Sequence, residues 1–135
     1  MRNRGSVVLL ENNQVALIRR RVDKLEYYVF PGGGIEANET PEEAAKREAL
    51  EELGVVVSIT SCLGILSYHG DQYFFLARIV SGRFGTGMGE EFCNKTTGRG
   101  TYHPVWIDIP QLMNIDVKPK EMAELLIEKC NELHV

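Results

Sequence analysis

The chain carries two short segments, GGIEANE at residues 33–39 and REALEELGV at residues 47–55, that decide how the rest of the sequence is interpreted. Glu48, Glu51 and Glu52 in the second segment are spaced at i, i+3 and i+4. Side chains at this spacing lie on the same side of an α-helix. The two segments therefore predict a glycine turn followed by a helix that gathers three carboxylates on one side.

The residues around these segments predict where the helix begins and ends. Thr40 is a suitable N-cap, Pro41 suits the first helical position, and Glu43 completes a capping box. Gly54 is typical of the residue that ends a helix, so the helix is predicted over residues 41–53. Four apolar residues are expected to form the face that packs inward: Ala45, Ala49, Leu50 and Leu53.

The acidic cluster by itself is open to two interpretations, a solvated helix face or a metal site. Like charges at this spacing destabilise a helix by about 0.2–0.5 kcal/mol per pair. Arg47 lies four residues from both Glu43 and Glu51, so it is expected to offset part of this repulsion. A hard cation such as Mg²⁺ would offset more, because it takes oxygen ligands. The helix spacing alone favours the solvated face, whereas the full pattern of both segments favours the metal site.

The full pattern resembles the signature of the Nudix hydrolases, enzymes that cut a nucleoside diphosphate linked to another group. A chance match at all the fixed positions has a probability of about 10⁻⁵ over the whole chain. Two other positions depart from the usual form, because Ala49 replaces a larger aliphatic residue and Asn38 a common glycine. Asn tolerates left-handed backbone angles, so the turn is still expected. Seven fixed positions match: Gly33, Glu39, Arg47, Glu48, Glu51, Glu52 and Gly54.

The resemblance implies a role for each charged residue of the motif. Glu48, Glu51 and Glu52 resemble metal ligands for Mg²⁺ or Mn²⁺, and either Glu51 or Glu52 resembles the group that helps to deprotonate water. Arg47 resembles the arginine that orients the glutamates, and Glu39 resembles a supporting acid near the start of the helix. Bound cations would hold phosphate oxygens, lower the pKa of water and stabilise the leaving group. The implied chemistry is metal-assisted hydrolysis of a phosphoanhydride.

Nudix hydrolases often draw a further carboxylate from a loop outside the motif. Residues 81–101 contain six glycines, and a loop of this length is usually either functional or disordered. Glu90 and Glu91 lie near its middle and are the candidates for this carboxylate, with mobile surface acids as the alternative. Gly33 and Gly54 are expected to allow the tight turns on either side of the motif.

Two groups of residues are candidates for substrate binding. Arg19 and Arg21 belong to a run of three arginines at a strand end, where alternate side chains face opposite sides. They are candidates to reach a phosphate, and a solvated strand end is an equal alternative. Tyr28 and Phe30 are one strand period apart, so one of them is a candidate to stack on a base, although core packing is favoured.

The remaining segments predict a mixed β-sheet with flanking helices. Residues 7–10 and 15–18 form an apolar pair of strands that indicates a hairpin, and a last helix is expected from about Pro119. This arrangement, like the resemblance, favours an α/β/α sandwich built as a single domain over residues 1–135. Further strands are predicted at residues 27–30, 55–59, 63–67, 72–79 and 102–108.

Composition excludes several classes of protein. No segment approaches the ~20 apolar residues of a membrane span, and no signal peptide is predicted. A net charge of −4 disfavours nucleic-acid binding through a basic surface. The three cysteines are odd in number and lack metal-site spacing, which favours free thiols and a cytoplasmic protein. Homodimers are common among Nudix proteins, so a homodimer is a family expectation.

The resemblance implies a small nucleotide-containing diphosphate as substrate. Nucleoside triphosphates, nucleotide sugars such as ADP-ribose, and dinucleoside polyphosphates all fit the motif, and nothing in the sequence chooses among them. One alternative is a non-catalytic nucleotide-binding or regulatory module on the same fold, which the intact motif disfavours. Another is hydrolysis at an RNA 5′ end, which the acidic balance and the absence of a basic stripe disfavour.

Overall fold

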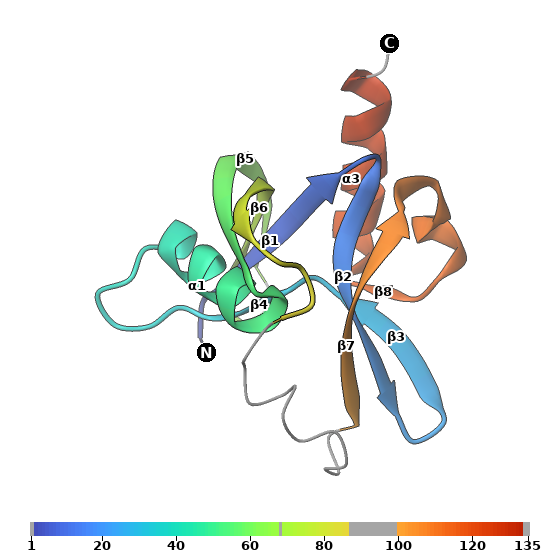
Figure 1. Cartoon of the computed structure of the whole chain (residues 1–135), viewed down its shortest axis with the longest axis horizontal. Helices are drawn as coiled ribbons and strands as arrows, with labels where there is room; N and C mark the ends of the chain where they lie inside the picture. Colours follow the sequence, from blue (N-terminus) through green and yellow to red (C-terminus); the bar gives the residue numbers. More distant parts are fainter. Residues whose placement is uncertain (1, 68, 87–99, 134–135) are drawn as a thin grey trace.

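The computed structural model describes residues 2–67, 69–86 and 100–133 (Figure 1). Helix α1 covers Pro41–Leu53, as the capping signals predict, and helix α3 covers Lys120–Leu133. A 3₁₀ helix, η1, covers Ile109–Asn114. The strands are β1 Arg4–Glu11, β2 Gln14–Val22, β3 Leu25–Val29, β4 Gly32–Gly34, β5 Val55–Ser67, β6 Asp71–Gly82, β7 Thr101–Asp108 and β8 Val117–Lys118.

The strands form one mixed sheet, which confirms the predicted fold class. Its main order is β5-β6-β1-β2-β3-β8, with β4 added to β1 and β7 added to β2. The β1–β6 and β3–β8 pairs are parallel, whereas the other strand pairs are antiparallel. Residues far apart in sequence are therefore brought side by side around β1 and β2.

The predicted hairpin between β1 and β2 is present, but the two strands pair only next to their turn. Asn12 and Asn13 form that turn with φ of 52° and 62°, left-handed values that asparagine tolerates. The paired positions are Leu10 with Val15 and Glu11 with Gln14. Beyond them β1 pairs with β4 and β6, while β2 pairs with β3 and β7. Figure 1 shows the two strands diverging from their shared turn.

Alternate side chains of the central strands divide the core into two layers. Val7 and Leu9 of β1 pack with Ala49 and Leu53 of α1. Val8, between them in sequence, belongs to the cluster that contains Met122 and Leu126 of α3. Because strand side chains alternate between faces, α1 covers one face of the sheet and α3 the other. The predicted α/β/α layering is therefore present.

The predicted inward face of α1 was wrong at one position. Ala45, Ala49 and Leu53 are fully buried as predicted, but Leu50 is 51% exposed. The buried face instead includes Glu48 and Glu52, which lie beside the alanine column on the opposite side from Leu50. The apolar spacing alone could not predict this rotation, because it contains no sign that two glutamates are buried.

The segments predicted as separate strands at residues 55–59 and 63–67 form the single strand β5. Irregularities in its pairing with β6 fall at Val56/Val57, Ile59/Ser61 and Cys62/Gly64. Bulges of this kind interrupt the apolar alternation of a strand without ending it. Within the described residues, no helix is long and apolar enough to cross a membrane.

Candidate active site

Helix α1 is fixed at both ends by the residues that the sequence indicates. The Thr40 hydroxyl accepts a hydrogen bond from the Glu43 N–H at 3.1 Å, and the Glu43 carboxylate accepts one from the Thr40 N–H at 2.8 Å. At the other end, Gly54 has φ of 80° and donates its N–H to the Leu50 carbonyl at 3.0 Å. These caps set the rotation and length of the helix that carries the acidic cluster.

The three clustered glutamates do not share one environment. Glu48 and Glu52 are buried, with exposed fractions of 9% and 6%, and they lie one helical turn apart. Glu52 Oε1 accepts a hydrogen bond from the Gly32 N–H at 3.1 Å. The side chain of Glu51 is 48% exposed. Buried carboxylates are costly unless they are compensated by hydrogen bonds or cations, so the Glu48 and Glu52 pair marks a built site.

Arg47 joins the two motif segments through five hydrogen bonds. Its Nε and Nη2 donate to the two carboxylate oxygens of Glu39 at 2.8 and 3.0 Å. Nη2 also donates to the Gly34 carbonyl at 3.0 Å. Nη1 donates to Glu48 at 3.1 Å and to Glu51 at 3.4 Å. Arg47 therefore ties the glycine turn to two glutamates of α1 in a fixed geometry.

The hydrogen bonds between Arg47 and Glu39 shift the pKa values of both side chains. The hydrogen bonds from Arg47 and from the Glu36 N–H lower the pKa of Glu39 to about 2. The Glu39 hydrogen bond raises the pKa of Arg47, which stays charged. Of the two contacts through which Arg47 was expected to offset the repulsion among the glutamates, the one with Glu51 is present at 3.4 Å. The one with Glu43 was wrong, because the Glu43 carboxylate caps the helix.

The glycines of β4 let the backbone approach the acidic helix closely. A Cβ atom placed on Gly33 would lie 2.2 Å from Glu48 Oε2, closer than real Cβ contacts allow. Asn38 has φ of 65°, which confirms that an asparagine holds the left-handed position of this turn. A larger residue at position 33 would therefore displace the Glu48 carboxylate from its place against the turn.

A cavity of about 340 Å³, here called the acid cavity, lies between α1, β2 and the glycine turn. It brings the two buried carboxylates together with two arginines that sequence analysis did not assign to the site. Its lining consists of Glu48, Glu52, Arg4, Arg20, Gly32, Gly33, Ile18, Val29, Phe30 and Tyr102.

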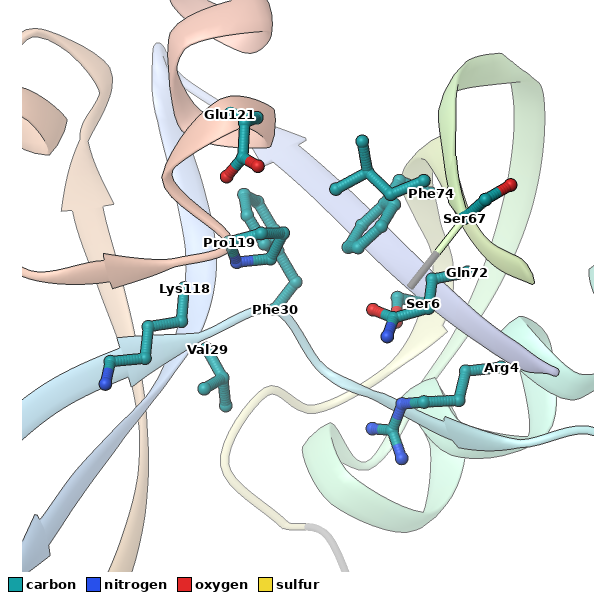
Figure 2. A pocket seen from close by; sticks show the side chains of 11 residues that line it. Arg4, Ser6, Val29, Phe30, Ser67, Gln72, Phe74, Lys118, Pro119 and Glu121 are labelled. Atoms are coloured by element: carbon teal, nitrogen blue, oxygen red, sulfur yellow. The ribbon is translucent and has the colours of Figure 1, made fainter. Parts of the chain in front are cut away.

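A second cavity of about 600 Å³, here called the aromatic cavity, shares Arg4, Val29 and Phe30 with the first (Figure 2). The rings of Phe30 and Phe74 pack edge to face in its wall, with centroids 5.7 Å apart. Figure 2 shows the Glu121 carboxylate and the Gln72 amide near these rings, while the ends of Lys118 and Ser67 point away from them. The polar residues of the lining are Arg4, Ser6, Ser67, Gln72, Lys118 and Glu121.

The arginines predicted to bind substrate are not the arginine of this run that lines the acid cavity. Arg20, and neither Arg19 nor Arg21, lines the acid cavity. The reason is strand alternation: Ile18 and Arg20 share the face that α1 covers, so the arginines on either side point to the other face. Ile18 lies two residues before Arg20 on the same face of β2 and is buried against α1. This burial indicates which of the three arginines faces the acid cavity. Arg21 instead forms an ion pair with Glu26 at 2.5 Å.

The two aromatic candidates also differ in their surroundings. Tyr28 packs against the core layer beside α3, whereas Phe30 belongs to that core and lines both cavities. Glu90 and Glu91 lie outside the described residues. Arg4 was missed because it occupies the exposed start of β1, 29 residues before Gly33, and reaches the cavity only through the pairing of β1 with β4.

The acid cavity offers the oxygen donors that a hard divalent cation takes. Among the described residues, no group of three acidic, histidine or cysteine side chains is close enough to hold a metal ion. The Glu48 carboxylate accepts a hydrogen bond from Arg47, and the Glu52 carboxylate accepts one from the Gly32 N–H. A cation bound to all three glutamates would therefore draw their carboxylates together. The donor chemistry fits Mg²⁺ or Mn²⁺, with Glu48 and Glu52 as the buried pair.

Comparison with known proteins agrees with this geometry. The model of the NUDIX domain matches residues 1–124. The chain is 31% identical over 132 residues to an 8-oxo-dGTP diphosphatase of Haemophilus influenzae, covering 96% of this chain and 91% of that one. It is 30% identical over 124 residues to an RNA pyrophosphohydrolase of Rhodospirillum rubrum, covering 82% and 74%.

A solved structure shows the same fold. A hydrolase of the NUDIX family from Clostridium perfringens superimposes with a TM-score of 0.72 at 19% identity, covering 98% of this chain and 97% of that one. Likeness at this identity supports the fold, while the domain match and the sequence relatives support the family. The chain belongs to the Nudix hydrolase family.

Proposed function

We propose that this chain, acting as a single domain over residues 1–135, hydrolyses a phosphoanhydride in a nucleoside diphosphate linked to another group, with Mg²⁺ or Mn²⁺ as cofactor. One observation carries the proposal: Glu48 and Glu52 are buried in the same cavity as Arg4 and Arg20. Carboxylates suit a divalent cation, and guanidinium groups suit phosphate oxygens. The cavity thus combines the two kinds of group that phosphoanhydride hydrolysis needs.

The residues of the chain have distinct tasks in this proposal. Glu48, Glu51 and Glu52 hold the cation, while Arg47 orients Glu48 and Glu51 and is itself anchored by Glu39. When bound, the cation activates water and neutralises charge on the phosphate oxygens. Either Glu51 or Glu52 accepts the proton of the attacking water.

The phosphate chain and the nucleoside occupy neighbouring spaces. Arg4 and Arg20 bind phosphate oxygens in the acid cavity, where they face the acidic helix. The base enters the aromatic cavity and packs against Phe30 and Phe74, since aromatic and apolar walls favour a planar ring. Attack at phosphorus then leaves two phosphorylated products.

The geometry leaves three substrate classes open: nucleoside triphosphates, nucleotide sugars such as ADP-ribose, and dinucleoside polyphosphates. The similarity to an 8-oxo-dGTP diphosphatase favours the first class, because that relative is matched over nearly all of both chains. The similarity to an RNA pyrophosphohydrolase supports a second candidate, hydrolysis at an RNA 5′ end. A net charge of −4 makes a long RNA the less favoured substrate.

Two further features belong to the proposal. We place the protein in the cytoplasm, because Cys62 and Cys130 are free thiols, which reducing compartments preserve. Burial raises the pKa of Cys130, which lowers its reactivity. We also expect a homodimer as a family property.

A phosphate-release screen tests the function directly. The protein is incubated with nucleoside triphosphates, nucleotide sugars, dinucleoside polyphosphates and a triphosphorylated RNA, each with Mg²⁺, Mn²⁺ or EDTA. After the hydrolase has been removed and excess divalent metal restored, phosphatase detects newly exposed phosphate ends of the substrates whose phosphates are blocked, and pyrophosphatase detects pyrophosphate released from the triphosphates. Turnover of one class that EDTA abolishes is the expected result. Absence of turnover across the panel, together with retained nucleotide binding, would favour the non-catalytic binding module instead.

A further inference from the structure

Cationic and aromatic side chains alternate across four neighbouring strands beside the acid cavity. The Arg20 guanidinium carbon lies 3.7 Å from the ring centroid of Tyr102 and 5.8 Å from that of Tyr27. The Lys118 ammonium lies 4.7 Å from the centroid of the same Tyr27 ring. We call the set Lys118, Tyr27, Arg20 and Tyr102 the cation–aromatic ladder.

Strand register explains why these side chains meet. Arg20 of β2 is directly opposite Tyr27 on β3 and directly opposite Tyr102 on β7, so all three project from one face of the sheet. Lys118 of β8 pairs with Val29, which lies two residues after Tyr27 on β3 and shares its face. The ladder is therefore a product of pairing between segments far apart in sequence.

The two cations of the ladder line different cavities. Arg20 and Tyr102 line the acid cavity, whereas Lys118 lines the aromatic cavity. Tyr27 lines neither of them as described, yet it contacts both cations. Arg20 is held further by a hydrogen bond from its Nε to the Thr101 carbonyl at 3.2 Å. The ring of Tyr27 thus contacts one cation from the lining of each cavity.

We propose that Tyr27 is a positioning residue that holds Arg20 and Lys118 as one phosphate-binding arm of the active-site cleft. The inference rests on the proposed function and adds a residue outside the Nudix motif. Long cationic side chains lose rotamer entropy when a ligand orders them. Contact with an aromatic ring orders them in advance through cation–π attraction. The arm therefore binds the phosphate chain of the substrate more tightly than two unsupported cations would.

The test compares Tyr27→Leu, which removes the ring, with Tyr27→Phe, which keeps it. Binding of inorganic pyrophosphate is measured by calorimetry in EDTA, so that it reports the cationic arm without base or metal. The KM and kcat for the substrate found in the screen are measured in parallel. Tyr73→Leu is the matched control, because Tyr73 stacks on Phe75 in another part of the sheet. Thermal unfolding of each variant shows whether it is folded.

Tyr27→Leu should weaken pyrophosphate binding and raise KM by roughly 3- to 10-fold, with kcat changed less than about twofold. Tyr27→Phe and Tyr73→Leu should stay within about twofold of wild type. If Tyr27→Leu does not fold, Tyr27→Met takes its place, because it also removes the ring and keeps an apolar side chain. Equal pyrophosphate affinity in Leu and Phe variants would overturn the proposal, as would wild-type protein that binds no pyrophosphate. Failure of catalysis alone, with the binding difference intact, would count against the proposed function only.

Discussion

Arg47 shows at the scale of single residues how the motif becomes a site. Its guanidinium group donates hydrogen bonds to both carboxylate oxygens of Glu39 and also to Glu48 and Glu51. The sequence predicted a contact between Arg47 and Glu51 from their helix spacing, and it implied a supporting role for Glu39 through the family resemblance. It did not predict that Glu39, eight residues before Arg47, would be the main partner, since that contact depends on the path of the turn.

The clamp between Arg47 and Glu39 predicts a specific dependence of stability on pH. The pKa of Glu39 is about 2 in the folded protein against 4.5 for an unperturbed glutamate, so the folded state holds the charged form more strongly. A lowered pKa stabilises the fold above pH 4.5, and this contribution is lost as pH falls from 4.5 towards 2. Urea unfolding of wild type and Glu39→Gln should give a difference in unfolding free energy that is steady above pH 4.5 and shrinks below it.

Removing the partner provides the control for this dependence. In an Arg47→Met background, the difference that Glu39→Gln produces should depend much less on pH, because only the weaker influence of the Glu36 N–H hydrogen bond remains. A wild-type difference that stays constant down to pH 2.5 would contradict the assignment of Arg47 as the cause of the lowered pKa of Glu39.

At the scale of elements, α1 was the segment most fully predicted from sequence. Its bounds follow from local signals at both ends, the capping box at Thr40 and the left-handed Gly54. Its rotation was not predicted correctly at Leu50, because burial of Glu48 and Glu52 depends on β4 and β2. Likewise β5 was predicted as two strands, because bulges set by its partner β6 interrupt the apolar pattern.

The capping box predicts how strongly the start of α1 contributes to stability. Thr40→Ala removes the hydroxyl that accepts the Glu43 N–H, so the unfolding free energy should fall by about 1 kcal/mol. Thr40→Ser keeps that acceptor and should change it by no more than a few tenths of a kcal/mol. Urea unfolding measures both. Equal stability of the Ala and Ser variants would show that the hydroxyl has no net capping role.

At the scale of the whole molecule, the site depends on how β1 and β2 separate after their short shared hairpin. The separation lets β4 pair with β1 and β3 pair with β2, and both cavities are lined by residues of these strands. Sequence analysis predicted a mixed sheet and the α/β/α layers. It could not supply the parallel β1–β6 pairing or the strand registers, which arise from contacts between distant segments. Arg4, Arg20 and the aromatic cavity were therefore found only in the folded chain.

We propose that the buried carboxylates of α1 make this molecule a metal-dependent hydrolase. The most direct test is the kcat of Glu52→Gln at saturating Mg²⁺ on the substrate found in the screen, beside Glu124→Gln, which alters an exposed acid of α3. Glutamine still accepts the Gly32 N–H but loses the charge, so kcat should fall by at least about 100-fold while thermal unfolding is unchanged. Glu124→Gln should match wild type. A Glu52→Gln enzyme with wild-type kcat would show that this buried carboxylate is not needed for hydrolysis.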